Sequence, residues 1–192
     1  LLEYRSTLLN PARQALGQTA AALVSKINEQ HASGMDLRGN LGGDLFTVAP
    51  PTVLYSGSNT GTGTVITEFG DMSQLTGADY LLEYDGSAYS LTRVDTGAVV
   101  PMSGTGTTGN PFVADGLRIN VGGVVSAAGD RMMIRSVRDF AASIRSVISD
   151  PQSLAFAAPT RSADSASNIG NATVTPATVV DPSSPALFIS SV

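Results

Sequence analysis

The first 46 residues divide the chain into a helical and a β-rich part; they read LLEYRSTLLNPARQALGQTAAALVSKINEQHASGMDLRGNLGGDLF. Residues 1–30 carry apolar side chains at helical spacing, whereas residues 31–46 are rich in glycine and aspartate and predict a turn-rich loop. The chain begins within the helical pattern and without a methionine. We therefore expect it to be the middle section of a longer protein.

Leucines recur at every seventh position of this segment, at Leu2, Leu9, Leu16 and Leu23, and Ile27 extends the same apolar stripe. Such a stripe packs either in the core of a small domain or against a partner helix. The spacing holds for about three repeats, at the lower limit of a coiled coil, so both interpretations stay open. If the partner lies outside this chain, the leucines will be only partly covered. These five residues are our candidates for packing between subunits.

Asn10 and Pro11 predict a division of the helical segment. Proline is costly inside a helix but favourable at its first position, and asparagine is a good N-cap. We expect one helix to end near Leu9 and a second to run from Pro11 to about Ser33. Gly34 should then stop the helix by adopting the left-handed conformation.

From residue 45 the apolar period changes to two, which predicts short strands separated by Gly, Asn and Asp turns. Strands are expected at 45–48, 52–55, 64–69, 80–84, 88–94, 98–100, 117–121 and 131–137. Asp85 and Gly86 favour a tight hairpin turn between two of them. A second helix should follow from Val137 to Ile148 and end at Asp150-Pro151. The expected core contributors are Leu82, Tyr84, Tyr89, Leu91, Ile119 and Val121.

The predicted fold class is α+β, with an N-terminal helical segment, a mainly antiparallel β sandwich or open barrel, and a second helix after it. We divide the chain into a helical segment with its connecting loop at 1–44, forming part of a helical shaft domain, and a β-rich outer domain at 45–137. A helix and extended return segment occupy 138–157. Residues 158–192 form either a linker or the truncated start of a further β domain.

Composition argues against several kinds of site. The chain has no cysteine, which excludes thiolate metal sites and cysteine nucleophiles, and its net charge of −5 argues against nucleic-acid binding. No apolar run approaches the ~20 residues that span a bilayer. His31 is the only histidine, and its expected place in the last turn of a surface helix suits a cation at a helix C-terminus.

Two motif matches are weak. Residues 104–109 have the spacing GxGxxG, but they run into Asn110-Pro111 rather than into a helix, so we interpret them as a hairpin loop. Asp36, Asn40 and Asp44 have some features of a calcium loop, but Arg38 occupies a ligand position and the bidentate glutamate is absent. We assign no catalytic, cofactor-binding or metal-binding residues.

The pattern His-x-x-Gly-x-Asp-Leu-x-Gly-Asn from His31 to Asn40, followed by paired glycines, is an unusual combination after a helix. Together with residues 2–5, 9–13, 16–18 and 27–30, it resembles the flagellar hook-associated protein 1 family, the first of two junction proteins between bacterial hook and filament. The resemblance implies a non-catalytic structural subunit, exported without a cleaved signal peptide to the extracellular flagellum. It implies contacts with the hook protein, the second junction protein and copies of itself, without nucleic acid, membrane or cofactor.

The isolated fragment should be monomeric. The alternative is a secreted β-rich binding or adhesion module unrelated to the flagellum, with exposed Thr, Gly and Ser loops as its contact surface. An adhesion module should bind its target without residues 1–33, whereas a junction subunit needs them to associate with other flagellar parts.

Overall fold

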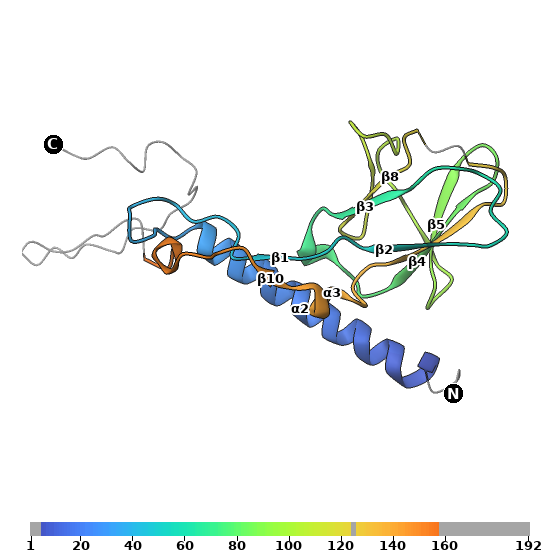
Figure 1. Cartoon of the computed structure of the whole chain (residues 1–192). Coiled ribbons are helices and arrows are strands. Elements are labelled where there is room, and N and C mark those ends of the chain that lie inside the picture. Colours follow the sequence, from blue (N-terminus) through green and yellow to red (C-terminus); the bar gives the residue numbers. More distant parts are fainter. Residues whose placement is uncertain (1–4, 124–125, 158–192) are drawn as a thin grey trace, which may run out of the picture. The chain divides into compact units, whose positions relative to one another are not determined.

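The computed structural model describes residues 5–123 and 126–157 (Figure 1). A π-helical turn, η1 (Arg5–Leu9), leads directly into the long helix α2 (Asn10–Ala32). The predicted change at Asn10-Pro11 is therefore a change of helix type rather than a gap between two helices. Pro11 has no N–H to donate, which favours an altered hydrogen-bond pattern at this point.

Two antiparallel sheets follow, and Figure 1 shows β3 and β8 of one sheet above β2 and β4 of the other. The five-stranded sheet has the order β2 (Thr52–Tyr55), β9 (Arg131–Arg135), β4 (Asp79–Tyr84), β5 (Tyr89–Arg93), β6 (Val99–Val100). The three-stranded sheet has the order β3 (Ile66–Phe69), β8 (Leu117–Asn120), β7 (Phe112–Ala114). The predicted α+β class with a mainly antiparallel β region is confirmed.

The core lies between the inner faces of these sheets. Side chains alternate along each strand, so Leu82 and Leu91 on one sheet and Leu117 and Ile119 on the other are fully buried. Of the remaining expected contributors, Val121 is buried, whereas Tyr84 and Tyr89 are half-buried and contact each other as tilted rings with centroids 4.7 Å apart.

The hairpin of β4 and β5 forms as predicted, with Tyr84 paired to Tyr89. Asp85 accepts hydrogen bonds from the N–H groups of Ser87 and Ala88, and Gly86 has a φ of +105°, which glycine adopts without strain. The GxGxxG segment is also a hairpin loop, since Ser103 pairs with Val113 and Thr107 pairs with Asn110 across it.

Two compact units are present, Leu1–Ser25 with Val48–Ile144, and Lys26–Thr47 with Arg145–Val192. The second unit contains the short strands β1 (Phe46–Thr47) and β10 (Arg145–Ser146), which pair antiparallel. The domain boundaries that we inferred from the sequence remain predictions. The expected linker or further β domain at 158–192 lies outside the described residues.

The second helix is much shorter than predicted. Only α3 (Phe140–Ser143) is helical within the expected 137–148, because Ile144 is extended and β10 then pairs with β1. The strand expected at 45–48 accordingly belongs to this two-stranded pair. Asp150 does not end a helix: it caps the 3₁₀ turn η3 (Pro151–Ser153), and a similar turn, η2 (Met72–Gln74), follows β3.

Candidate packing surface of the long helix

One face of α2 packs within its own unit through small side chains. Gly17, Ala20, Ala21 and Val24 are all buried, at the three- and four-residue spacing of a single helix face. Gly17 makes the closest approach, because a Cβ built there would lie 1.9 Å from the backbone oxygen of Val137. Glycine at this position therefore lets the helix backbone lie directly against the chain at residue 137.

Two polar contacts reinforce this face. The side-chain amide of Gln18 donates to the backbone oxygen of Leu75 at 3.1 Å. The guanidinium of Arg13 forms a salt bridge of 2.7 Å with Asp139, and both side chains are partly exposed. Exposed ion pairs contribute little stability, so the packing of the small apolar residues contributes most to holding the helix in place.

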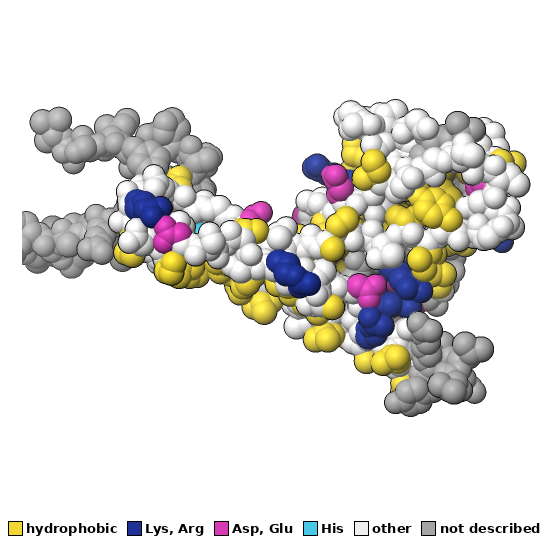
Figure 2. Space-filling view, in the orientation of Figure 1, with side chains coloured by type: hydrophobic (Ala, Val, Ile, Leu, Met, Phe, Trp, Pro, Cys, Tyr) yellow, Lys and Arg dark blue, Asp and Glu magenta, His cyan; other side chains and the backbone are white. Residues whose placement is uncertain are grey.

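The leucine stripe lies on a different face, about a quarter turn away at 3.6 residues per turn. Leu9, Leu16 and Leu23 are 44%, 61% and 58% exposed. Hydrophobic side chains follow the lower edge of α2 in Figure 2. The expectation of partly covered leucines is confirmed at these three positions, whereas Leu2 lies outside the described residues and Ile27 is half-buried.

No charge interrupts this face between Leu9 and Leu23. The residues that share it are exposed and uncharged: Ala12, Ala15, Leu16, Thr19 and Ala22. A face of this composition can only pack against another apolar surface, and its alanines leave room for large side chains between the leucines. Chemically it is suited to helix packing and not to catalysis.

The end of α2 is organised around His31, which is 1% exposed. Its Nδ1 lies 2.7 Å from the oxygen of Gly43 and its Nε2 lies 3.0 Å from the nitrogen of Ala155. An amide N–H can only donate, so Nε2 accepts and Nδ1 carries the proton. Our expectation of a cationic surface histidine is wrong, because the loop after the helix and the returning segment with Phe156 cover the ring.

Our prediction that Gly34 stops the helix in a left-handed conformation is wrong, because its φ is not positive. A Cβ there would lie 1.8 Å from the oxygen of Ala155. Next to it, Met35 and Ala157 exchange backbone hydrogen bonds of 2.8 and 3.3 Å. Glycine is required here by the close passage of the returning chain.

The aspartates of the loop after α2 serve to fold it. The Asp36 carboxylate accepts from the N–H groups of Asn40 and Arg38, both at 2.8 Å, and the bond from Asn40 is the main cause of its lowered pKa. The pKa of Asp150 is also lowered. The main cause is the hydrogen bond from the N–H of Gln152, and the second is the guanidinium of Arg38, which lies 2.5 Å from the carboxylate. Within the described residues no three His, Cys, Asp or Glu side chains could hold a metal ion together.

Asp130 ties two loops of the β region together. Its carboxylate accepts hydrogen bonds from the backbone N–H groups of Ala127 at 2.8 Å, Thr60 at 2.9 Å and Gly61 at 3.1 Å. These bonds, first of all that from Ala127, lower its pKa below the ordinary value. Asp130 is thus a structural carboxylate.

Two further polar clusters lie between or beside the sheets. Tyr80 donates to Asp115 at 2.9 Å, Arg93 binds the same carboxylate at 2.6 Å, and burial raises the pKa of Tyr80 to about 12. Asp79 pairs with Arg138, and burial raises the pKa of the Asp79 carboxyl despite this cation. Each carboxylate pairs with an arginine of the fold, which indicates a structural role, although Asp79 Oδ1 and Arg138 Nε are buried without a hydrogen-bond partner.

Sequence reasoning missed the buried face of α2. Its signal was present: a glycine inside a helical pattern costs about 1 kcal/mol against alanine and so suggests close packing. Gly17 with Ala20, Ala21 and Val24 has that form.

None of the helices among the described residues is long and apolar enough to cross a membrane.

Comparisons with known proteins converge on one family. The profile described as flagellar hook-associated protein FlgK helical domain matches residues 1–46, and that described as flagellar hook-associated protein 1, D2-like domain, matches residues 54–136. Flagellar hook-associated protein 1 of Escherichia coli is 28% identical over 172 residues, which are 90% of this chain and 31% of that protein. Its namesake in Salmonella typhimurium is 35% identical over 124 residues, 64% of this chain and 22% of that protein.

A solved structure of the same family is also similar to this chain. The flagellar hook junction protein FlgK from Burkholderia pseudomallei is similar with a TM-score of 0.72 and 34% identity, over 88% of this chain and 30% of that one. The chain thus spans less than a third of the length of these relatives.

Proposed function

Because this chain belongs to the flagellar hook-associated protein 1 family, we propose that it is part of a structural subunit at the hook–filament junction of the bacterial flagellum. Its location is accordingly the extracellular flagellum, reached without a cleaved signal peptide. Its role is packing rather than catalysis, and it needs no cofactor. None of the comparisons favours the alternative of an unrelated adhesion module.

The observation that carries this proposal is the division of α2 into two faces. The face with Gly17 is occupied within the chain, while Leu9, Leu16 and Leu23 are 44–61% exposed over an uncharged surface. Fully burying a leucine yields roughly 1.5–3 kcal/mol, so three of them are a substantial unused source of association energy. We propose that neighbouring helices of the assembly cover them, with Leu2 and Ile27 at the ends of the same surface.

The partners that the family suggests are the hook protein, the second junction protein and further copies of this protein. A single narrow stripe is much smaller than the ~800 Å² per partner of a stable interface. We therefore expect residues 1–192 to remain monomeric in dilute solution and to be held only where several helices meet.

The test replaces Leu9, Leu16 and Leu23 together by glutamine in the full-length protein. Glutamine is a good helix former, so the fold should be retained while the apolar contact is removed. We expect the variant protein to be absent from isolated hook–filament structures and the cells to lose motility. Val94→Ser is the control, because Val94 is an apolar residue of the β region that is likewise half exposed, at 50%.

Circular dichroism of residues 1–192 with the same three substitutions separates assembly from folding. The proposal is wrong if the folded triple variant is incorporated, and supports motility, as well as the control.

A further inference from the structure

His31 is a titratable side chain that is buried between two segments distant from each other in the sequence. It lies in the last turn of α2 and is 1% exposed. Its Nδ1 donates to the oxygen of Gly43, and its Nε2 accepts from the N–H of Ala155, which is itself fully buried. The neutral imidazole with its proton on Nδ1 therefore satisfies both neighbours at once.

The charged form of the ring does not fit these partners. An imidazolium carries an N–H at both nitrogens, so its Nε2 would direct a proton at the N–H of Ala155, and neither group can accept. The backbone at Gly42 packs so closely against the ring that a Cβ there would lie 2.8 Å from Nδ1, which confines the ring. A proton gained at Nε2 thus removes a hydrogen bond and leaves two donors facing each other.

No carboxylate offsets a positive charge at this place. The returning segment, residues 154–157, has no titratable side chain, and Asp44 on the loop after α2 is exposed. The other charged side chains nearby in the sequence are engaged elsewhere: Lys26 with Glu29, Arg38 with Asp150, and Asp36 with the N–H groups of its own loop. Within the described part of the chain no salt bridge includes the ring. Water must therefore solvate the charged ring, which requires the site to open.

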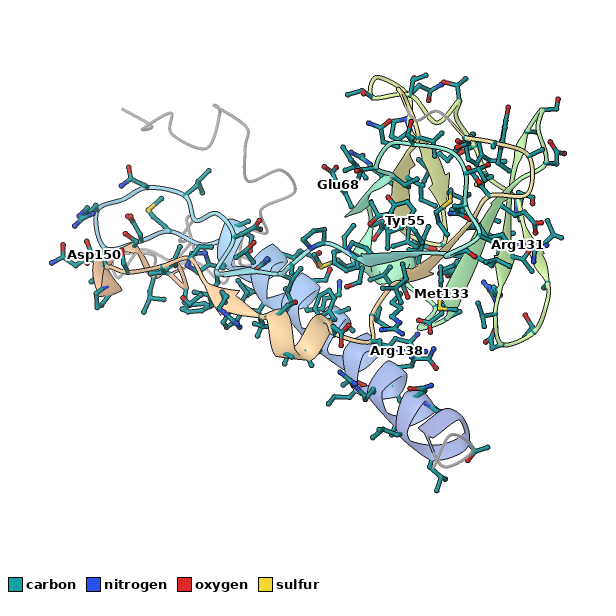
Figure 3. All side chains as sticks on the ribbon, turned by 45° about the vertical axis from the view of Figure 1, so that its right-hand side comes forward. Tyr55, Glu68, Arg131, Met133, Arg138 and Asp150 are labelled. Carbon is teal, nitrogen blue, oxygen red and sulfur yellow. The ribbon has the colours of Figure 1, made fainter. Side chains whose placement is uncertain are left out.

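We propose that His31 is a pH-dependent switch, whose protonation releases the returning segment from the end of α2. The backbone pair of Met35 and Ala157, with hydrogen bonds of 2.8 and 3.3 Å, lies next to the switch and opens with it. Figure 3 shows Asp150 beside the loop that follows α2, and its salt bridge with Arg38 does not involve the ring, so the segment stays attached there.

The direction of the pH dependence follows from the number of protons bound. The open form binds one proton more than the closed form, so the closed form is favoured at neutral pH and loses stability as the pH falls. An imidazole in water takes up its proton near pH 6.5, which places the change in the mildly acidic range. This switch goes beyond the proposed function, because it concerns how the chain responds to the pH of its surroundings.

Amide hydrogen exchange of the 192-residue chain, measured by NMR at about pH 7.5 and about pH 5, tests the switch. The protection factor of the Ala155 amide should fall by up to about 30-fold between these values, if the imidazole titrates near pH 6.5 only in the open form. The amide of Met35 should follow it. The amide of Val113, which donates to Ser103 at 2.8 Å in the β region, is the internal control and should change little.

His31→Gln is the matched variant, because glutamine is never charged and its side-chain oxygen can accept from the N–H of Ala155. In this variant the pH dependence at Ala155 should disappear. The switch is refuted if Ala155 stays protected in the unsubstituted chain at the lower pH, or if His31→Gln loses the same protection. Loss at Ala155 with Met35 unchanged would mean that the ring moves and the segment does not, which also contradicts the proposal.

A second measurement decides the matter if His31→Gln does not fold. The nitrogen chemical shifts of the ring report the protonation of Nε2 in the unsubstituted chain, and this protonation must accompany the loss of protection at Ala155. Loss of protection without it rules the switch out. Such a result leaves the proposed function intact, since the exposed leucines of α2 do not contact the ring.

Discussion

Replacing Gly17 by alanine should destabilise the chain, although alanine is the better helix former by about 1 kcal/mol. A Cβ at this position would lie 1.9 Å from the oxygen and 2.8 Å from the carbonyl carbon of Val137. Restoring an ordinary contact of 3.4 Å requires the helix and this backbone to separate by about 1.5 Å, the difference between 3.4 and 1.9 Å. Both atoms belong to backbone, which cannot rotate away.

This separation affects the whole buried face. It loosens the packing of Ala20, Ala21 and Val24 and lengthens the bond from Gln18 to the chain at residue 75. Overpacking costs about 1–3 kcal/mol and a lost hydrogen bond about 1 kcal/mol, against a helix-propensity gain of about 1 kcal/mol. We expect the free energy of unfolding to fall by about 1–3 kcal/mol, or the Tm by roughly 2–12 °C.

Urea denaturation of residues 1–192, followed by circular dichroism, measures this change. Ala15→Gly is the control, because Ala15 lies on the exposed face and should lose only the helix-propensity term of about 1 kcal/mol. If Gly17→Ala is as stable as the unsubstituted chain or more stable, the close approach does not fix the helix and the assignment of its two faces fails.

Substitutions at three further residues test the polar contacts. Asp115→Ala should lower the free energy of unfolding by about 1–3 kcal/mol by removing the carboxylate that binds Arg93, and Asp115→Asn should lose less; thermal melts of both decide this. His31→Ala should lower the free energy of unfolding by roughly 2–5 kcal/mol. If hydrogen exchange of the Ala155 amide, which donates to Nε2 of His31, is unchanged in this variant, the assignment of a buried, hydrogen-bonded histidine is wrong. Hydrogen bonds, first of all that from the N–H of Ala127, lower the pKa of Asp130 in the folded chain. The ionised carboxylate therefore stabilises the fold above about pH 4, the ordinary pKa of aspartate, and this stabilisation is lost as the pH falls through the lowered pKa of the folded state. Asp130→Asn should therefore be less stable at pH 7 and flatten the acid part of the stability curve, which denaturation at several pH values measures.

The sequence pattern predicted the class and most strands, because apolar periodicity reports which residues are buried. It failed where tertiary contacts override local preference. Residues 137–148 have helical spacing, yet β10 within them pairs with β1 across nearly 100 residues. Strand β7 (Phe112–Ala114) was not predicted, because its three residues are all apolar and show no alternation.

Only one of the two faces of α2, the one with the leucines, was predicted from the sequence. The leucines are the most apolar residues of the helix, and their seven-residue spacing is visible without a structure. Gly17 and the neighbouring alanines contribute little hydrophobicity, so a pattern based on apolar side chains does not detect the face that they form. Likewise nothing local to His31 indicates burial, since the residues that enclose it come from 43 and 155–156.

The pairing of β1 with β10 also bears on how such proteins vary. Thr47 is opposite Arg145, so the 48–144 segment leaves and rejoins the chain at neighbouring residues of one ladder. The loops of a segment attached in this way can be lengthened or shortened during evolution without displacing the two short strands at its ends. Exchange of the whole segment would in addition have to preserve the surface on which Gly17 and Gln18 of α2 pack, so we expect related chains to differ mainly in the loops that lie away from these contacts.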